Sequence, residues 1–171
     1  TDKLIQSARR AAINDGAGAR AIIEEIQNQH LAVIDELITN PDEKRTLLQE
    51  IYQRLDELSN YCESIQVIGE VTPGGMDVIS SLGERINAPI IAAVIRSLGT
   101  PAQAVEASRC IITDRTFQNA VPDMLRSREQ IQSTLSPLFQ QSIVPVVTGF
   151  LGATPEGVIT TLGRGGSDYT A

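Results

Sequence analysis

The sequence changes character at Gly99. Before this residue, apolar side chains recur at helical spacing over residues 2–14, 19–39 and 41–65. A further apolar block opens at the TPGG of residues 72–75 and predicts a fourth helix with Gly99 at its C-cap. Pro89 predicts a kink or a break inside that helix.

After Gly99 the pattern is one of short strands with a helix between them. Strands are predicted over residues 102–108, 110–114 and 142–150, and a helix over 122–141. The run over 142–150 is continuously apolar, which is typical of a strand covered on both faces. GATPEG, residues 152–157, predicts a turn into the strand VITTL. This order of elements predicts an α/β fold with a largely parallel sheet in two or three layers.

Composition excludes several function classes. The 171 residues carry 14 Lys+Arg against 21 Asp+Glu, a net charge of -7 without a basic run, so no nucleic-acid partner is expected. The longest uninterrupted apolar stretches, IVPVV and APIIAAVI, are too short to cross a bilayer, so no membrane partner is expected either. Cys62 and Cys110 lack a C-x-x-C partner, which suits a reducing compartment and predicts buried, unpaired thiols. His30 is the only histidine, so we expect a hydrogen-bonded, partly buried side chain and no metal site.

The last twelve residues, TTLGRGGSDYTA, combine a strand with a glycine-rich turn. The glycines are Gly163, Gly165 and Gly166. Such a turn lets backbone N–H groups approach a ligand, and Ser167 and Asp168 would cap a following helix whose N-terminus favours anions. Arg164 adds a planar cation suited to a carboxylate or phosphate. The alternative is a strand-to-helix turn with a surface arginine, and spacing alone leaves both interpretations open.

Two further positions could carry chemistry. Glu84 lies within an apolar helical block, where it could bind a ligand ammonium group or form a surface ion pair with Arg85. Thr113 and Asp114 follow a predicted strand, at the place where α/β sheets usually hold their ligand crevice. A turn-forming role for the Asp114 side chain is the alternative.

Several segments together resemble the aspartate kinases of the amino-acid kinase family. They are SSLGERINAPIIAAVIRSLGTPAQAVEAS, IITDRTFQNA and IVPVVTGFLGATPEGVITTLGRGGSDYTA, in this order, with an opening TDKL similar to the end of the family's S-A-M-x-x-V-T-D-x-L. The resemblance covers nearly the whole chain and is weakest over residues 5–65. It implies a three-layer α/β/α sandwich with a largely parallel sheet, of which residues 1–171 would form an incomplete, substrate-binding lobe.

The resemblance also implies an activity and a setting. The parent enzyme would transfer the γ-phosphoryl group of ATP, with Mg2+, to the side-chain carboxylate of L-aspartate, at the entry to lysine, threonine and methionine synthesis. It would be cytoplasmic and a homo-oligomer. The alternatives are another amino-acid kinase with a different acceptor, or a folded interaction fragment without activity.

The residues that the resemblance assigns to substrate binding come from both halves of the chain. They are Thr1, Glu84, Phe150, Arg164, Ser167 and Asp168. In this assignment Arg164 clamps the α-carboxylate of aspartate and Glu84 holds its α-ammonium group. The family's K-F-G-G-T-S segment, with its phosphate-binding lysine, has no counterpart in the 171 residues, nor have the nucleotide lobe and the ACT domains. We therefore assign no catalytic residue, and expect this chain alone to associate and not to turn over ATP with aspartate.

Overall fold

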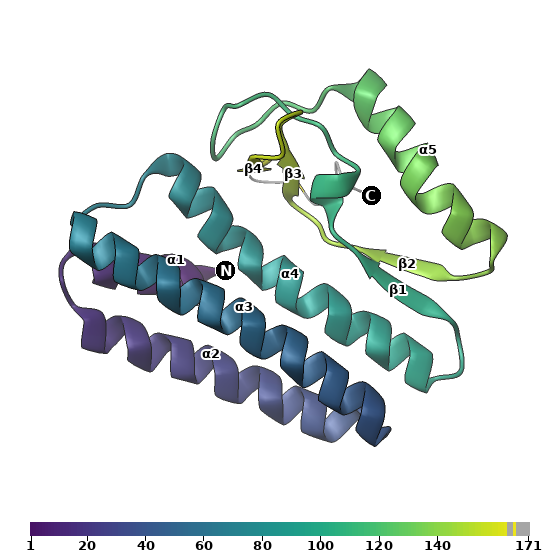
Figure 1. Ribbon diagram of the computed structural model, residues 1–171, viewed down its shortest axis with the longest axis horizontal. Helices are drawn as coiled ribbons and strands as arrows, with labels where there is room; N and C mark the ends of the chain where they lie inside the picture. The colour runs from purple at the N-terminus through teal and green to yellow at the C-terminus, as the bar shows by residue number, and fades with distance from the viewer. Residues whose placement is uncertain (164–165, 167–171) are drawn as a thin grey trace. The chain divides into compact units, whose positions relative to one another are not determined.

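Four helices account for most of the first 97 residues in the computed structural model (Figure 1). They are α1 (Asp2–Ala12), α2 (Gly16–Leu37), α3 (Pro41–Ile68) and α4 (Pro73–Ser97). They are followed by β1 (Ala102–Val105), the 3-10 turn η1 (Ala107–Arg109), α5 (Met124–Gln140), β2 (Val144–Val147), β3 (Leu151–Ala153) and β4 (Ile159–Thr161). The structure describes residues 1–163 and 166. The chain divides into two compact units, Thr1–Ile86 and Asn87–Ala171, and the division falls within α4.

The first unit is helical and is held by an aliphatic core. Helices α1, α2 and α3 pack against one another, as the purple and blue ribbons of Figure 1 show. Their core side chains are at most 8% exposed and include Leu4, Ile23, Ile26, Ile34, Ile51, Leu55 and Leu58. Fully burying one such side chain contributes about 1.5–3 kcal/mol, so this core is the main source of the unit's stability.

The start of α3 confirms the predicted cap. The Asn40 side-chain oxygen accepts hydrogen bonds from the amides of Asp42 and Glu43 at 3.0 and 3.2 Å. Asp15 caps α2 in the same way, accepting from the Gly18 amide at 2.9 Å and from Arg10 at 2.8 Å. These bonds, that of the Gly18 amide first, lower the pKa of the Asp15 carboxyl. Each cap supplies an acceptor for amides that lack a partner within the helix.

Helix α4 differs from the sequence prediction in two ways. It continues through Pro89 without a break. The uninterrupted apolar runs of this helix are short. The whole helix is nevertheless long and apolar enough to cross a membrane, judged by length and composition alone. Its most apolar part is 56% buried in the structure. The buried set includes the polar side chains Asp77, Ser80 and Ser81, and core helices of soluble proteins meet the same criteria.

The second unit contains two short ladders. β1 and β2 pair in parallel, from Ala102 opposite Val144 to Val105 opposite Val147. This parallel pair and the helix α5 between its strands fit the predicted α/β class. β3 and β4 pair antiparallel, and residues 154–158 connect them. The predicted turn at 152–157 therefore starts two residues too early, because Gly152 and Ala153 belong to β3.

Three strand predictions need correction. The strand predicted over residues 102–108 ends at Val105, because η1 begins at Ala107. Residues 110–114 do not form a continuous strand, because η1 bends the chain there. The Ala107 carbonyl accepts hydrogen bonds from the amides of Cys110 and Ile111 at 2.8 and 2.7 Å. Only single bridges remain there, such as that between Ile112 and Ala153. β2 is not covered on both faces, since Val144 is 40% exposed.

The core of the second unit lies around β1, η1, α5, β3 and the end of β4. Its buried members are Val105, Ala107, Cys110, Ile111, Ala120, Leu138, Leu151 and Leu162. Ile131 and Leu135 of α5 and Val147 of β2 pack against them. The core therefore supports the strand ends that lead into the glycine-rich turn.

Candidate functional site

The glycine-rich turn follows β4, and its backbone requires glycine at two described positions. Gly163 has φ +74°, and a Cβ on it would lie 2.9 Å from the Asn119 side-chain oxygen. A Cβ on Gly166 would lie 2.7 Å from the Leu162 Cβ. The Gly166 amide donates to the Gly163 carbonyl at 3.2 Å, which closes the turn. These two glycines therefore set a backbone path that a residue with a side chain would disturb.

Phe150 lies at this turn, and its assigned role in substrate binding stays a prediction. Its carbonyl accepts a hydrogen bond from the Leu162 amide at 2.8 Å, and its Cα is 3.4 Å from the Cβ position of Gly166. Phe150 itself has φ +70°, an unfavourable conformation for a residue with a side chain. The surrounding contacts thus hold a half-buried aromatic residue against the turn.

Thr1 and Glu84 both belong to the first unit, and Thr1 approaches Gly83, the residue before Glu84. A Cβ on Gly83 would be 3.8 Å from the Thr1 Oγ1 and 3.3 Å from Leu4 Cδ1, so the start of α1 approaches α4 at the residue before Glu84. Arg85, the alternative partner for Glu84, has its Nη1 3.8 Å from Glu57 Oε2 on α3. The Glu84 side chain is half-buried.

The other three predicted site residues lie outside the described residues. They are Arg164, Ser167 and Asp168. Their substrate-binding roles stay predictions. What the structure brings together is Thr1 with Gly83 beside Glu84 in one unit, and Phe150 with the glycine turn in the other.

Asp114 takes the turn-forming role that was the alternative at sequence level. Its carboxylate accepts from the Thr116 and Val121 amides at 3.2 and 2.9 Å and from the Thr116 hydroxyl at 2.8 Å. These hydrogen bonds, that from Val121 first, lower the pKa of the Asp114 carboxyl. The neighbouring Thr113 is buried, and its hydroxyl lies 2.6 Å from that of Thr160 on β4.

Sequence reasoning missed the contact between the segment after Asp114 and the glycine turn. Asn119 is the residue whose side chain meets Gly163. The Ala120 amide donates to the Thr161 carbonyl at 2.9 Å. A segment quoted only for its family resemblance therefore contacts the candidate binding turn directly.

The remaining reactive side chains have structural roles in the described part of the chain. His30 is half-buried, with Nδ1 2.7 Å from the Ile26 carbonyl. Cys62 and Cys110 are free and buried, as predicted. Over residues 1–163 and 166, no group of three or more His, Cys, Asp or Glu side chains could hold a metal ion.

Burial should protect both cysteines from thiol reagents. Desolvation raises the pKa of the Cys62 and Cys110 thiols, which lowers the fraction of reactive thiolate. We expect both to react with Ellman's reagent at least about a hundredfold more slowly in the folded chain than in guanidinium, because reaction requires local opening. A thiol that reacts in the native chain as fast as in denaturant would contradict this packing.

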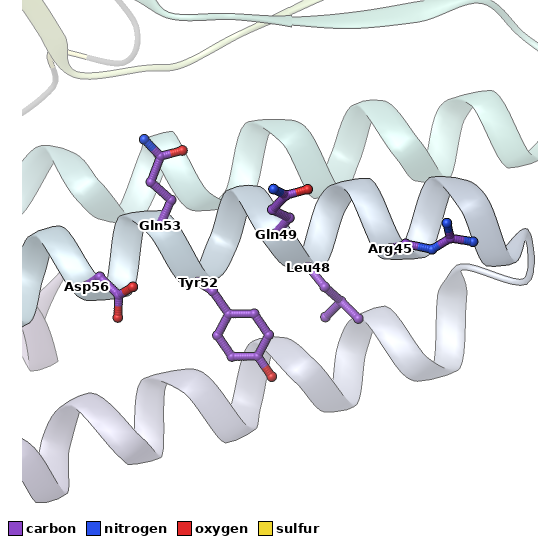
Figure 2. A pocket seen from close by; sticks show the side chains of 6 residues that line it. All are labelled: Arg45, Leu48, Gln49, Tyr52, Gln53 and Asp56. Carbon is purple, nitrogen blue, oxygen red and sulfur yellow. The ribbon is translucent and has the colours of Figure 1, made fainter.

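A shallow groove follows α3 in the first unit. None of the residues that line it is a predicted site residue. Its lining residues are Arg45, Leu48, Gln49, Tyr52, Gln53 and Asp56. Figure 2 shows Leu48 and Tyr52 pointing to one side of the helix, and Gln49 and Gln53 to the other. Because these side chains do not point toward a common centre, the groove is not a convincing ligand site, and the glycine turn remains the candidate site.

Comparisons with known proteins identify the family of this chain. The model of the amino acid kinase family matches residues 5–171, so the chain belongs to that family. Within it, the chain is similar to aspartokinases. It is 28% identical to the aspartokinase of Schizosaccharomyces pombe and 32% identical to aspartokinase 1 of Arabidopsis thaliana, in both cases over the whole of this chain.

A solved structure gives the same result for the fold. Aspartokinase III of E. coli, crystallised with aspartate and ADP, matches 98% of this chain with a TM-score of 0.85 and 26% sequence identity. The match covers 36% of the E. coli chain. The chain likewise spans about a third of the length of the two aspartokinases, 33% and 30%.

Proposed function

We propose that the complete encoded protein is an aspartate kinase that transfers the γ-phosphoryl group of ATP to the side-chain carboxylate of L-aspartate. The product is 4-phospho-L-aspartate, an intermediate for lysine, threonine and methionine synthesis. The observation that carries this proposal is the similarity to aspartokinases over the whole chain, including one crystallised with aspartate and ADP. The glycine turn with Phe150 against it supports the same assignment.

In the proposed mechanism this chain binds and orients the acceptor. Arg164 pairs with the α-carboxylate through two parallel hydrogen bonds, and Glu84 pairs with the α-ammonium group. Fixing both charged groups on the α-carbon leaves the side-chain carboxylate free to attack the γ-phosphorus. Phosphoryl transfer depends mainly on such positioning and on charge stabilisation. ATP with Mg2+ supplies the phosphoryl group, and Mg2+ in such sites is bound largely through substrate phosphates.

The test measures aspartate-dependent ADP release by the complete encoded polypeptide. Hydroxylamine in the same reaction would trap the acyl phosphate as a hydroxamate, so both products should appear in equal amounts. Glutamate, N-acetylglutamate and UMP serve as alternative acceptors. Turnover with one of them and none with aspartate would replace the proposal with the different-acceptor alternative.

We also propose that the protein is a cytoplasmic homo-oligomer. The two free cysteines support a reducing compartment. On α5, Met124, Leu125 and Phe139 are 69%, 71% and 62% exposed, which favours association. Light scattering of the purified protein tests the oligomeric state, and a strictly monomeric species would contradict it.

A further inference from the structure

The glycine turn is supported by a loop from a distant part of the sequence, the support loop (residues 114–121). The Asn119 side-chain oxygen and the Gln118 carbonyl lie 2.9 and 3.2 Å from the Cβ position of Gly163. The Ala120 amide donates to the Thr161 carbonyl, two residues before Gly163. The support loop therefore contacts the turn at the residue that directly precedes Arg164.

Asp114 closes the support loop on itself. Its carboxylate accepts three hydrogen bonds, two from Thr116 and one from the Val121 amide. Its own amide donates to the Val121 carbonyl at 3.1 Å, so the two ends of the loop are joined in both directions. Without the carboxylate, the Thr116 and Val121 amides lose their acceptor and the loop loses its closure.

The base of the support loop is attached to the strands that carry the turn. The Thr113 amide donates to the Ala153 carbonyl of β3 at 2.9 Å, and the Thr113 hydroxyl pairs with that of Thr160 on β4. Hence Asp114 is fixed at one end to β3 and β4, while Asn119 reaches the turn at the other. Movement of the loop would be transmitted to Gly163.

We propose that Asp114 is a positioning residue for the aspartate site, acting through the support loop on the backbone of the glycine turn at Gly163. This inference rests on the proposed function. A purely structural role for Asp114 would lower stability without a selective effect on aspartate. A positioning role therefore predicts that loss of Asp114 raises the KM for aspartate relative to the KM for ATP, whereas a purely structural role predicts no such selective rise.

The experiment uses the complete encoded polypeptide and its Asp114→Ala and Asp114→Asn variants. We expect Asp114→Ala to raise the KM for aspartate about tenfold, since small displacements of binding groups are costly, while the KM for ATP changes less than about twofold. Asp114→Asn keeps one oxygen for the two amides and should recover most of the affinity. Asp15→Ala is the matched control, because it removes a carboxylate with similar hydrogen bonds from the first unit, and it should leave both KM values unchanged.

Isothermal titration with aspartate separates the possible outcomes. If the wild-type protein neither binds nor phosphorylates aspartate, the proposed function fails. If the wild-type protein binds and Asp114→Ala binds equally well, only the positioning role is overturned. Should Asp114→Ala fail to fold, Asn119→Ala removes the side chain at Gly163 and leaves the Asp114 bonds intact. A severalfold rise in its aspartate Kd supports the inference, and an unchanged Kd overturns it.

Discussion

Replacing Arg164 by alanine should lower kcat/KM for aspartate roughly a hundredfold in the complete protein. In the proposed site the guanidinium forms a charge-assisted pair with the α-carboxylate, and removing it leaves a bound anion without its partner. Such a loss is on the order of 3 kcal/mol. Steady-state kinetics with aspartate and ATP varied separately should show a large effect on aspartate and little effect on the KM for ATP.

Two further variants make this result specific. Arg164→Lys should restore little activity, because an ammonium group cannot make the two parallel hydrogen bonds of the planar guanidinium. Arg128→Ala removes an exposed arginine from α5 and should leave the kinetics unchanged. If Arg164 is only a surface residue beside a turn, its alanine variant should differ by less than about 0.5 kcal/mol, and the assigned site would lose its central residue.

Gly152→Val should destabilise the fold more than any other single change considered so far. A Cβ at this position in β3 would lie 2.8 Å from the Ile111 carbonyl oxygen and 2.7 Å from Thr113 Cγ2. Backbone atoms cannot move aside as a flexible side chain can, so we expect a loss of about 3 kcal/mol or more. For a chain of this size, that corresponds to a fall in Tm of about 6–12 °C, measurable by circular dichroism.

Gly157→Ala is the matched control for this effect. Gly157 has φ +84°, but nothing lies within 4 Å of its Cβ position. The alanine therefore adds conformational strain without a steric clash and should cost only about 1 kcal/mol. Equal Tm values for Gly152→Val and the wild-type protein would show that β3 and the Ile111 segment are not packed as described.

Features decided by nearby residues could be predicted from the sequence, and features decided by distant contacts could not. The cap at Asn40 depends on amides two and three residues away, and it was predicted correctly. Cys110–Asp114 has strand-forming residues, but η1 and the bridge from Ile112 to Ala153 decide its conformation. Similarly, α4 continues through Pro89 although proline cannot donate a backbone hydrogen bond.

In the candidate site, too, local features could be predicted from the sequence and long-range contacts could not. The glycine turn was predicted from the composition of a single short segment, and Phe150 was assigned to substrate binding from the family resemblance. The contact of Asn119 with Gly163 joins positions 44 residues apart, and no local pattern indicates it. Asp114 showed two possible roles in sequence, and only its hydrogen bonds to Thr116 and Val121 decide in favour of the turn.

The hydroxyl pair of Thr113 and Thr160 couples two positions in the evolution of this sequence. Both side chains are buried, and each hydroxyl is the other's partner at 2.6 Å. Valine at one position alone would take that partner from the remaining hydroxyl, whereas valine at both would replace the pair with apolar groups of the same shape. A lineage that loses one threonine is therefore under selection to lose or restore the other. Descendants of this sequence should carry hydroxyls at both positions or at neither.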